Sequence, residues 1–103
     1  MPGPPEEAAS EIEVTRADVE QFLSRFTVRL TDAGGSSEHV VTLSGSDWDR
    51  LGRGYRSPED LIRASFAFLL EREPRTSIMN SFDVSQIATF FPEFERTIAR
   101  RPD

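Results

Sequence analysis

The segment SPEDLIRASFAFLLEREP, from Ser57 to Pro74, constrains the fold of this chain more than any other stretch. Its first residues carry the signals of a helix N-terminus. Ser57 can cap the helix, Pro58 suits the first helical position, and acidic residues follow in the first turn. Pro74 ends the helix, because proline disfavours helical geometry in the residue before it. The segment therefore predicts a helix over about residues 58–72.

Apolar side chains surround most of this helix. At about 100° per residue, they cover about twice the stripe that an amphipathic surface helix needs. They are Leu61, Ile62, Ala64, Phe66, Phe68, Leu69 and Leu70. Because exposing two such side chains would sacrifice several kcal/mol, the helix must be covered on more than one side. We expect a homodimer to complete this cover; the alternative is that shorter helices of the same chain wrap it completely.

Before this helix, the spacing of the apolar residues changes from a helical to a strand-like period. Val14–Phe26 places apolar residues at three- and four-residue spacing, which predicts a short helix. Phe26–Thr31 alternates apolar and polar residues, and His39–Ser44 is rich in β-branched residues; both indicate strands. The connector between them is too short for a parallel crossover, so we expect an antiparallel hairpin.

Further helix signals follow the hairpin. Ser46 can cap a short helix before the central one, and Asp83 with Gln86 forms a capping box for a later one. The predicted fold class is α+β: an N-terminal helix, a two-stranded antiparallel β-hairpin, then three or four helices around the central apolar helix. Residues 1–13 are expected to be a disordered acidic leader, and residues 14–103 a single domain.

Charge and composition exclude several classes of function. The formal net charge is −6, and residues 1–24 hold −5 of it, which leaves −1 for the rest. A nearly neutral domain is not suited to polyanions, so we do not expect a nucleic-acid partner. No apolar run approaches the roughly 18 residues that a membrane span needs, and the first residues lack the regions of a secretory signal. We predict a cytoplasmic protein without membrane contact.

The chain offers few groups for catalysis or metal binding. It has no cysteine, and its single histidine, His39, is expected at the surface. Two pairs of acidic residues lie two positions apart on predicted helices, where their side chains diverge. No nucleophile, base and orienting group can be assembled, so we predict a non-enzymatic protein without catalytic residues, metal or cofactor.

One cluster is a candidate for contact with an anion or a partner. In DRLGRGYR, Arg50, Arg53 and Arg56 lie on a glycine-containing turn together with Tyr55. Arginines there can bind phosphate or carboxylate while the tyrosine stacks. The alternative is a structural loop whose arginines pair with nearby acidic residues: Asp47, Asp49 or Glu59. A similar structural role, pairing with a nearby acid, is expected for Arg72.

Ala64–Glu95 resembles a group of small, uncharacterised bacterial proteins. The shared pattern is S-F-x-F-L-L-x-R-E-P, then S-I, an apolar helix and F-P-E. In this chain it corresponds to Ser65–Pro74, Ser77-Ile78 and Phe91–Glu93. The resemblance implies no particular activity.

Val40–Leu70 is similar to the ribbon-helix-helix DNA-binding fold, which has a short strand followed by two helices. This resemblance implies an intertwined dimer whose strands face DNA. The strand at His39–Ser44 lacks the side chains that base edges favour, so the alternative DNA-facing strand is the one with Thr27, Arg29 and Thr31. We predict a protein-interaction module with an unidentified protein partner; the alternative is a ribbon-helix-helix-like DNA-binding regulator acting as a dimer.

Overall fold

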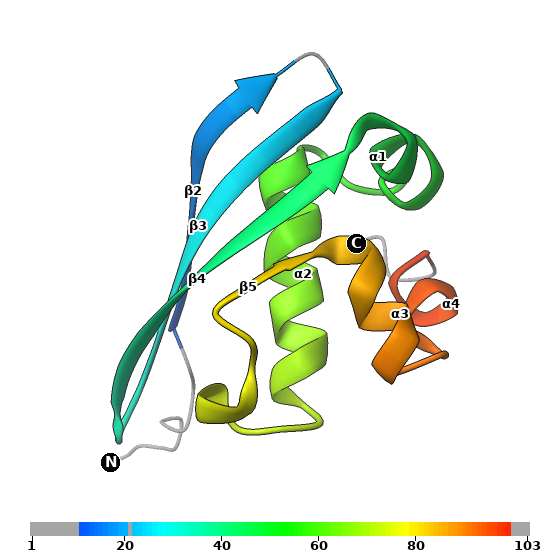
Figure 1. The fold of residues 1–103 in the computed structure, drawn as a ribbon. Helices are drawn as coiled ribbons and strands as arrows, with labels where there is room; N and C mark the ends of the chain where they lie inside the picture. The colour runs from blue at the N-terminus through cyan, green and yellow to red at the C-terminus, as the bar shows by residue number, and fades with distance from the viewer. Residues whose placement is uncertain (1–10, 21, 100–103) are drawn as a thin grey trace.

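Strands, not a helix, occupy most of residues 11–44. The computed structural model describes residues 11–20 and 22–99 (Figure 1). The strands are β2 (Glu11–Glu20), β3 (Leu23–Asp32), β4 (Gly35–Ser44) and β5 (Ser81–Asp83). The helices are α1 (Gly45–Leu51), α2 (Pro58–Leu70), α3 (Ile87–Phe90) and α4 (Phe94–Ala99), with 3₁₀ turns η1 (Arg75–Ser77) and η2 (Val84–Gln86).

The four strands form one mixed sheet in the order β2-β3-β4-β5. β2, β3 and β4 are antiparallel neighbours, whereas β5 pairs parallel with β4. The chain reaches β5 only after passing through α1 and α2, as a parallel connection requires. Figure 1 shows α2 lying along the sheet, with α3 and α4 beside it. No helix in the described part of the chain is long and apolar enough to cross a membrane.

The predicted N-terminal helix over residues 14–26 is wrong, and so is the two-stranded hairpin. Residues 14–20 belong to β2, and the described residues form a sheet of four strands. The helical spacing depended on Phe22, but this side chain lies in the turn between β2 and β3 and is 72 % exposed. Ile12 and Val14 instead continue a period of two that packs against the core. Of the predicted leader, residues 11–13 are part of β2, and residues 1–10 lie outside the described residues.

The inner face of the sheet carries the core. Phe26, Val28 and Leu30 of β3 are fully buried, as their alternation predicts, and Val41 and Leu43 of β4 join them. The turn between these strands has only two residues, because the strands extend to Asp32 and Gly35. The expected connector is therefore mostly strand.

His39 was predicted at the surface, and this is wrong. It shares the inner face of β4 with Val41, and its side chain is about 1 % exposed. Its Nδ1 lies 2.7 Å from the carbonyl oxygen of Met79, and its Nε2 lies 2.8 Å from the Ser37 hydroxyl. Since a carbonyl only accepts, Nδ1 carries a hydrogen and donates it. His39 thereby ties β4 to the segment that leads into β5.

Helix α2 is the central element and is covered by its own chain. Ser57 caps it by accepting a hydrogen bond from the backbone N–H of Asp60. The side chains that surround it are almost completely buried: Leu61, Ile62, Phe66, Phe68 and Leu69. The sheet covers one side of the helix. On another side, the ring of Phe94, which belongs to α4, packs edge-on against Phe68. The homodimer stays a prediction, although most of the apolar side chains of α2 are covered within one chain.

The tip of the β3–β4 hairpin is held by Arg75. Its Nε donates to a carboxylate oxygen of Asp32 at 3.1 Å, and the other oxygen accepts from the backbone N–H of Gly34. These two donors hold the pKa of Asp32 below its usual value. A carboxyl whose pKa is lower in the folded state stabilises the fold above its unfolded pKa of about 3.9. That contribution disappears as the pH falls through the folded value.

We expect the Phe66→Ala variant to lose about 3–5 kcal/mol of unfolding free energy, because its ring is fully buried between His39 and Phe82. Phe22→Ala is the matched control and should change stability by less than about 0.5 kcal/mol. Urea denaturation followed by Trp48 fluorescence measures both. Equal losses would contradict this assignment of the core.

The Arg75→Met variant should be less stable than the wild type at neutral pH, and the difference should narrow below about pH 4. The reason is that protonated Asp32 no longer gains from the guanidinium. Urea midpoints at neutral and acidic pH test this. In an Asp32→Asn background the same substitution should have a pH-independent effect. A wild-type difference that stays constant with pH would contradict the role of this pair.

Candidate functional site

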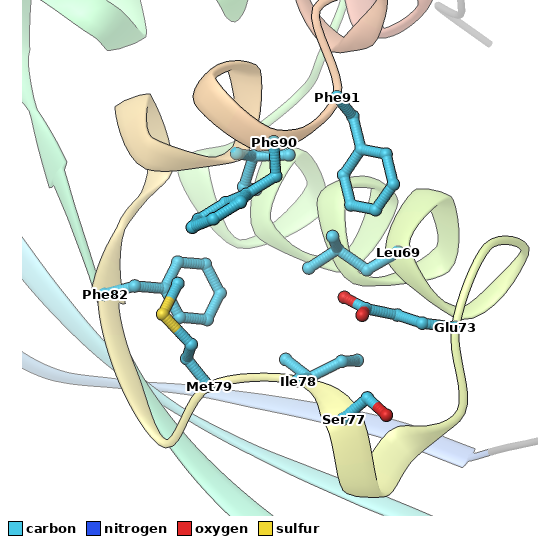
Figure 2. Close-up of a pocket in the computed structure, with 9 residues that line it drawn as sticks. Leu69, Glu73, Ser77, Ile78, Met79, Phe82, Phe90 and Phe91 are labelled. Carbon is cyan, nitrogen blue, oxygen red and sulfur yellow. The ribbon is translucent and has the colours of Figure 1, made fainter.

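A pocket of about 350 Å³ opens beside the C-terminal end of α2, and we call it the α2 pocket. Figure 2 shows side chains converging on it from α2, from the segment leading into β5, and from α3. The lining residues are Leu69, Glu73, Ser77, Ile78, Met79, Phe82, Ile87, Phe90 and Phe91. Most of this surface is aliphatic or aromatic.

The floor and the rim of the α2 pocket differ in burial. Leu69, Ile78, Phe82 and Ile87 are buried and belong to the core. At the rim, Met79 is 40 % exposed and Phe90 is 60 % exposed. The third exposed large hydrophobic side chain in the described part of the chain, Phe22, lies in the β2–β3 turn. Exposed apolar surface is thus concentrated at the mouth of this pocket.

Local sequence signals place the pocket walls. After Pro74 the chain makes the turn η1, which brings Ile78 back against the core. The backbone then joins the sheet, where the N–H of Val40 donates to the carbonyl of Asn80 at 2.8 Å. Together with the His39 hydrogen bond to Met79, this contact fixes the wall that precedes β5.

The opposite wall begins at the predicted capping box. The Asp83 carboxylate accepts from the backbone N–H of Ser85, and the Gln86 side chain accepts from the N–H of Asp83. The turn η2 and the single helical turn of α3 follow directly and present Phe90. Next to it, Phe91 packs edge-on against the ring of Phe68, with centroids 5.9 Å apart.

The lining contains two polar side chains, Glu73 and Ser77. In Figure 2 the Glu73 carboxylate extends into the pocket rather than away from it. Among residues 11–20 and 22–99, Glu73 has no ion-pair partner. The lining holds no histidine, cysteine or arginine.

The arginines that flank Glu73 in the sequence are engaged elsewhere. Arg72 lies 3.6 Å above the ring of Phe68, and its guanidinium binds Glu93 and Glu71 at 3.1 Å each. The backbone N–H of Glu93 and the Arg72 side chain lower the pKa of the Glu93 carboxyl. Arg72 therefore has the predicted structural role: it pairs with Glu71 and with Glu93, the residue directly before α4. Arg75 is bound to Asp32.

Two members of the predicted cluster at residues 50–56, Arg50 and Tyr55, make contacts within the chain. Arg50 binds both Asp47 and Glu95 at 2.6 Å, and these partners raise its pKa, Glu95 more than Asp47. The Tyr55 hydroxyl donates to the carbonyl of Ile98 at 2.8 Å. These two residues tie the α1 region to α4.

Arg53 and Arg56 are exposed and have no ion-pair partner within the described ranges. Glu59, named as an alternative partner for this loop, instead binds Arg16 of β2 at 2.8 Å. The loop also depends on Gly52, since a Cβ there would lie 2.2 Å from the Trp48 ring. Contact of this loop with an anion or a partner stays a prediction.

The alternative DNA-facing residues lie on the outer face of the sheet. Arg29 is exposed there, between half-buried Thr27 and Thr31. Its guanidinium binds Glu38 at 3.1 Å, and Glu13 lies opposite it in the pairing of β2 with β3. Acidic neighbours on both sides reduce the attraction of this face for phosphate. In the described part of the chain, no group of three or more His, Cys, Asp or Glu residues could hold a metal ion.

Sequence reasoning missed the α2 pocket, although one signal was present. Phe90 and Phe91 are consecutive and stand directly before Pro92, which ends a helix only one turn long. Two adjacent side chains at the end of so short a helix point in different directions, and here Phe91 packs against the core while Phe90 is exposed.

Comparisons of the chain with protein-family models, with curated proteins and with solved structures find no match. The site is therefore interpreted from its geometry alone.

The Tyr55→Phe variant should lose about 0.5–1.5 kcal/mol of unfolding free energy, because the Ile98 carbonyl loses its hydroxyl donor. Arg53→Ala, in the same loop, should cost less than about 0.5 kcal/mol. Thermal and urea denaturation measure both variants. If Arg53→Ala were the more destabilising change, the structural role given to Tyr55 would be wrong.

Proposed function

We propose that the chain is a non-enzymatic protein-interaction module and that the α2 pocket is its contact surface. The observation that carries the proposal is the concentration of exposed apolar side chains, Met79 and Phe90, around a preformed cavity. Exposed apolar patches of this kind mark interaction sites in soluble domains. The proposal keeps the protein partner and the cytoplasmic location that the sequence predicts.

The size and chemistry of the pocket favour binding over turnover. Its volume of about 350 Å³ is at the small end of the range for ligand sites, enough for one or two apolar side chains. Binding hot spots in interfaces are typically such pockets, filled by an anchor and surrounded by less important contacts. Glu73 and Ser77 supply polar contacts that can orient the bound segment.

No specific observation supports the DNA-binding alternative. β4, the strand that would form an intermolecular ribbon, is paired on one side with β3 and on the other with β5. A dimer ribbon would have to replace one of these pairings. We therefore do not favour the ribbon-helix-helix-like regulator over the interaction module.

The proposal predicts that interaction depends on the rim of the α2 pocket. A photo-reactive amino acid placed at position 90 should form cross-links to a defined partner in cells, and Met79→Asp should reduce their yield about tenfold or more. The charge of the aspartate disfavours contact with an apolar anchor. Mass spectrometry of the cross-linked species gives the yield and the partner.

The matched control uses the other exposed aromatic residue. Position 22 is far from the pocket residues in the sequence, and its side chain does not line the pocket. The same photo-reactive group at this position should not cross-link to this partner. Phe22→Asp should leave the yield from position 90 unchanged. Equal cross-linking from positions 22 and 90, or no effect of Met79→Asp, would contradict the proposed surface.

A further inference from the structure

We infer that the partner segment presents an arginine beside its apolar anchor, and that Glu73 receives this arginine inside the α2 pocket. The inference rests on the proposed function, because it specifies the chemistry of the partner that the pocket binds. It follows from the charge of the lining, from the arrangement of aromatic rings, and from the way the same molecule binds one of its own arginines.

The charge of the lining is the first argument. Of the nine lining residues, Glu73 alone is charged, and it has no ion partner among the described residues. Once a partner covers the pocket, this carboxylate loses water, and an unpaired buried charge is costly. A partner with a positive charge at this point avoids the cost. The neighbouring Arg72 and Arg75 are held by other carboxylates and do not supply it.

The walls supply the second argument. Figure 2 shows the rings of Phe82, Phe90 and Phe91 around the space into which the Glu73 carboxylate extends. An arginine guanidinium is flat, so it can stack on an aromatic face while its N–H groups bind a carboxylate. Lysine lacks this planar fork. The rings and the carboxylate together thus favour arginine over other cations.

The molecule already shows this mode of recognition. Arg72 stacks on the ring of Phe68 at 3.6 Å and donates to the Glu93 carboxylate at 3.1 Å. A ring and a carboxylate there hold a guanidinium at the edge of the same helix. The α2 pocket offers the same two components, with Glu73 as the carboxylate, and the described residues place no cation between them.

The buried floor decides between a protein segment and a free organic cation. Leu69, Ile78 and Ile87 lie deeper than the rim and present only apolar atoms. A small amine would leave this floor uncovered, whereas a segment with an apolar side chain next to its arginine fills both parts. Charge complementarity and the apolar floor therefore point to a partner protein segment.

The test is a pair of peptide titrations followed by NMR of ¹³C-labelled methyl groups in Met79, Ile78 and Ile87. The probes are acetyl-Leu-Arg-Leu-amide and its citrulline analogue, which keeps the shape of arginine but not its charge. Both should shift the methyl signals of the pocket, and the arginine peptide should bind about tenfold more tightly.

The variant Glu73→Gln should bind both peptides equally, because it keeps the size of the side chain and removes the charge. Glu38→Gln is the control, since Glu38 is an exposed carboxylate on the outer face of the sheet. It should retain the preference for arginine. Loss of the preference in both variants would overturn the assignment to Glu73.

The other outcomes separate this inference from the proposed function. Equal binding of both peptides to the wild type would overturn the arginine inference, while the cross-linking test of the pocket would stand. Failure of both peptides to shift the pocket methyl groups would overturn the inference too. Failure of the cross-linking test alone would instead remove the pocket as a protein contact.

Two further measurements test the occupant. n-Butylammonium that competes as strongly as the arginine peptide would assign the pocket to a free amine and overturn the inference. A solution mass near twice 11.6 kDa that falls to 11.6 kDa in Glu73→Gln would show that a second copy supplies the arginine. A mass near 11.6 kDa for both proteins agrees with a separate partner.

Discussion

The packing of α2 against the inner face of the sheet determines the rest of the structure. Phe66 lies at the centre of this contact, with His39 of β4 on one side and Phe82 of β5 on the other, each ring centroid 5.7 Å away. These rings join three elements that are distant in the sequence. The short elements that follow, α3 and α4, are too short to be stable alone and depend on docking to α2.

The same contact fixes the α2 pocket. Its floor is made of residues that also belong to the core, so its shape is set by core packing rather than by loop conformation. Its mouth is made of side chains that lie outside the core, such as Phe90. A pocket built in this way is preformed, and a preformed surface loses less entropy when it binds.

Sequence reasoning succeeded at two helix starts where one local signal sufficed, and was wrong at α1, which Ser44 rather than Ser46 caps. Ser57 with Pro58, and Asp83 with Gln86, start their elements as their types predict, because capping depends on residues within one turn. It failed where a choice depended on distant neighbours. Val14–Phe26 has apolar residues at helical spacing, but pairing of β2 with β3 over ten-residue strands outweighs that preference.

The other incorrect or missing predictions have the same cause. His39 is polar and follows a turn-rich segment, yet its place beside Val41 on β4 puts it in the core, where Met79 and Ser37 satisfy its nitrogens. The pocket could not be predicted because its shape depends on how residues 77–91 fold back against α2. The parallel pairing of β4 with β5, which joins residues 41 positions apart, helps to hold that segment in place. The apolar helix was identified, but its cover within one chain depends on that same pairing.

The position of β2, β3 and β4 before α2 has a consequence for synthesis of the protein. The three antiparallel strands leave the ribosome before α2, with the apolar side chains of Phe26, Val28 and Val41 on one open face. At about 5–20 residues per second, the end of α2 follows the end of β4 by roughly one to five seconds. During that interval no helix covers the apolar face of these strands. This face is open to chaperones that bind exposed apolar segments until α2 packs against it.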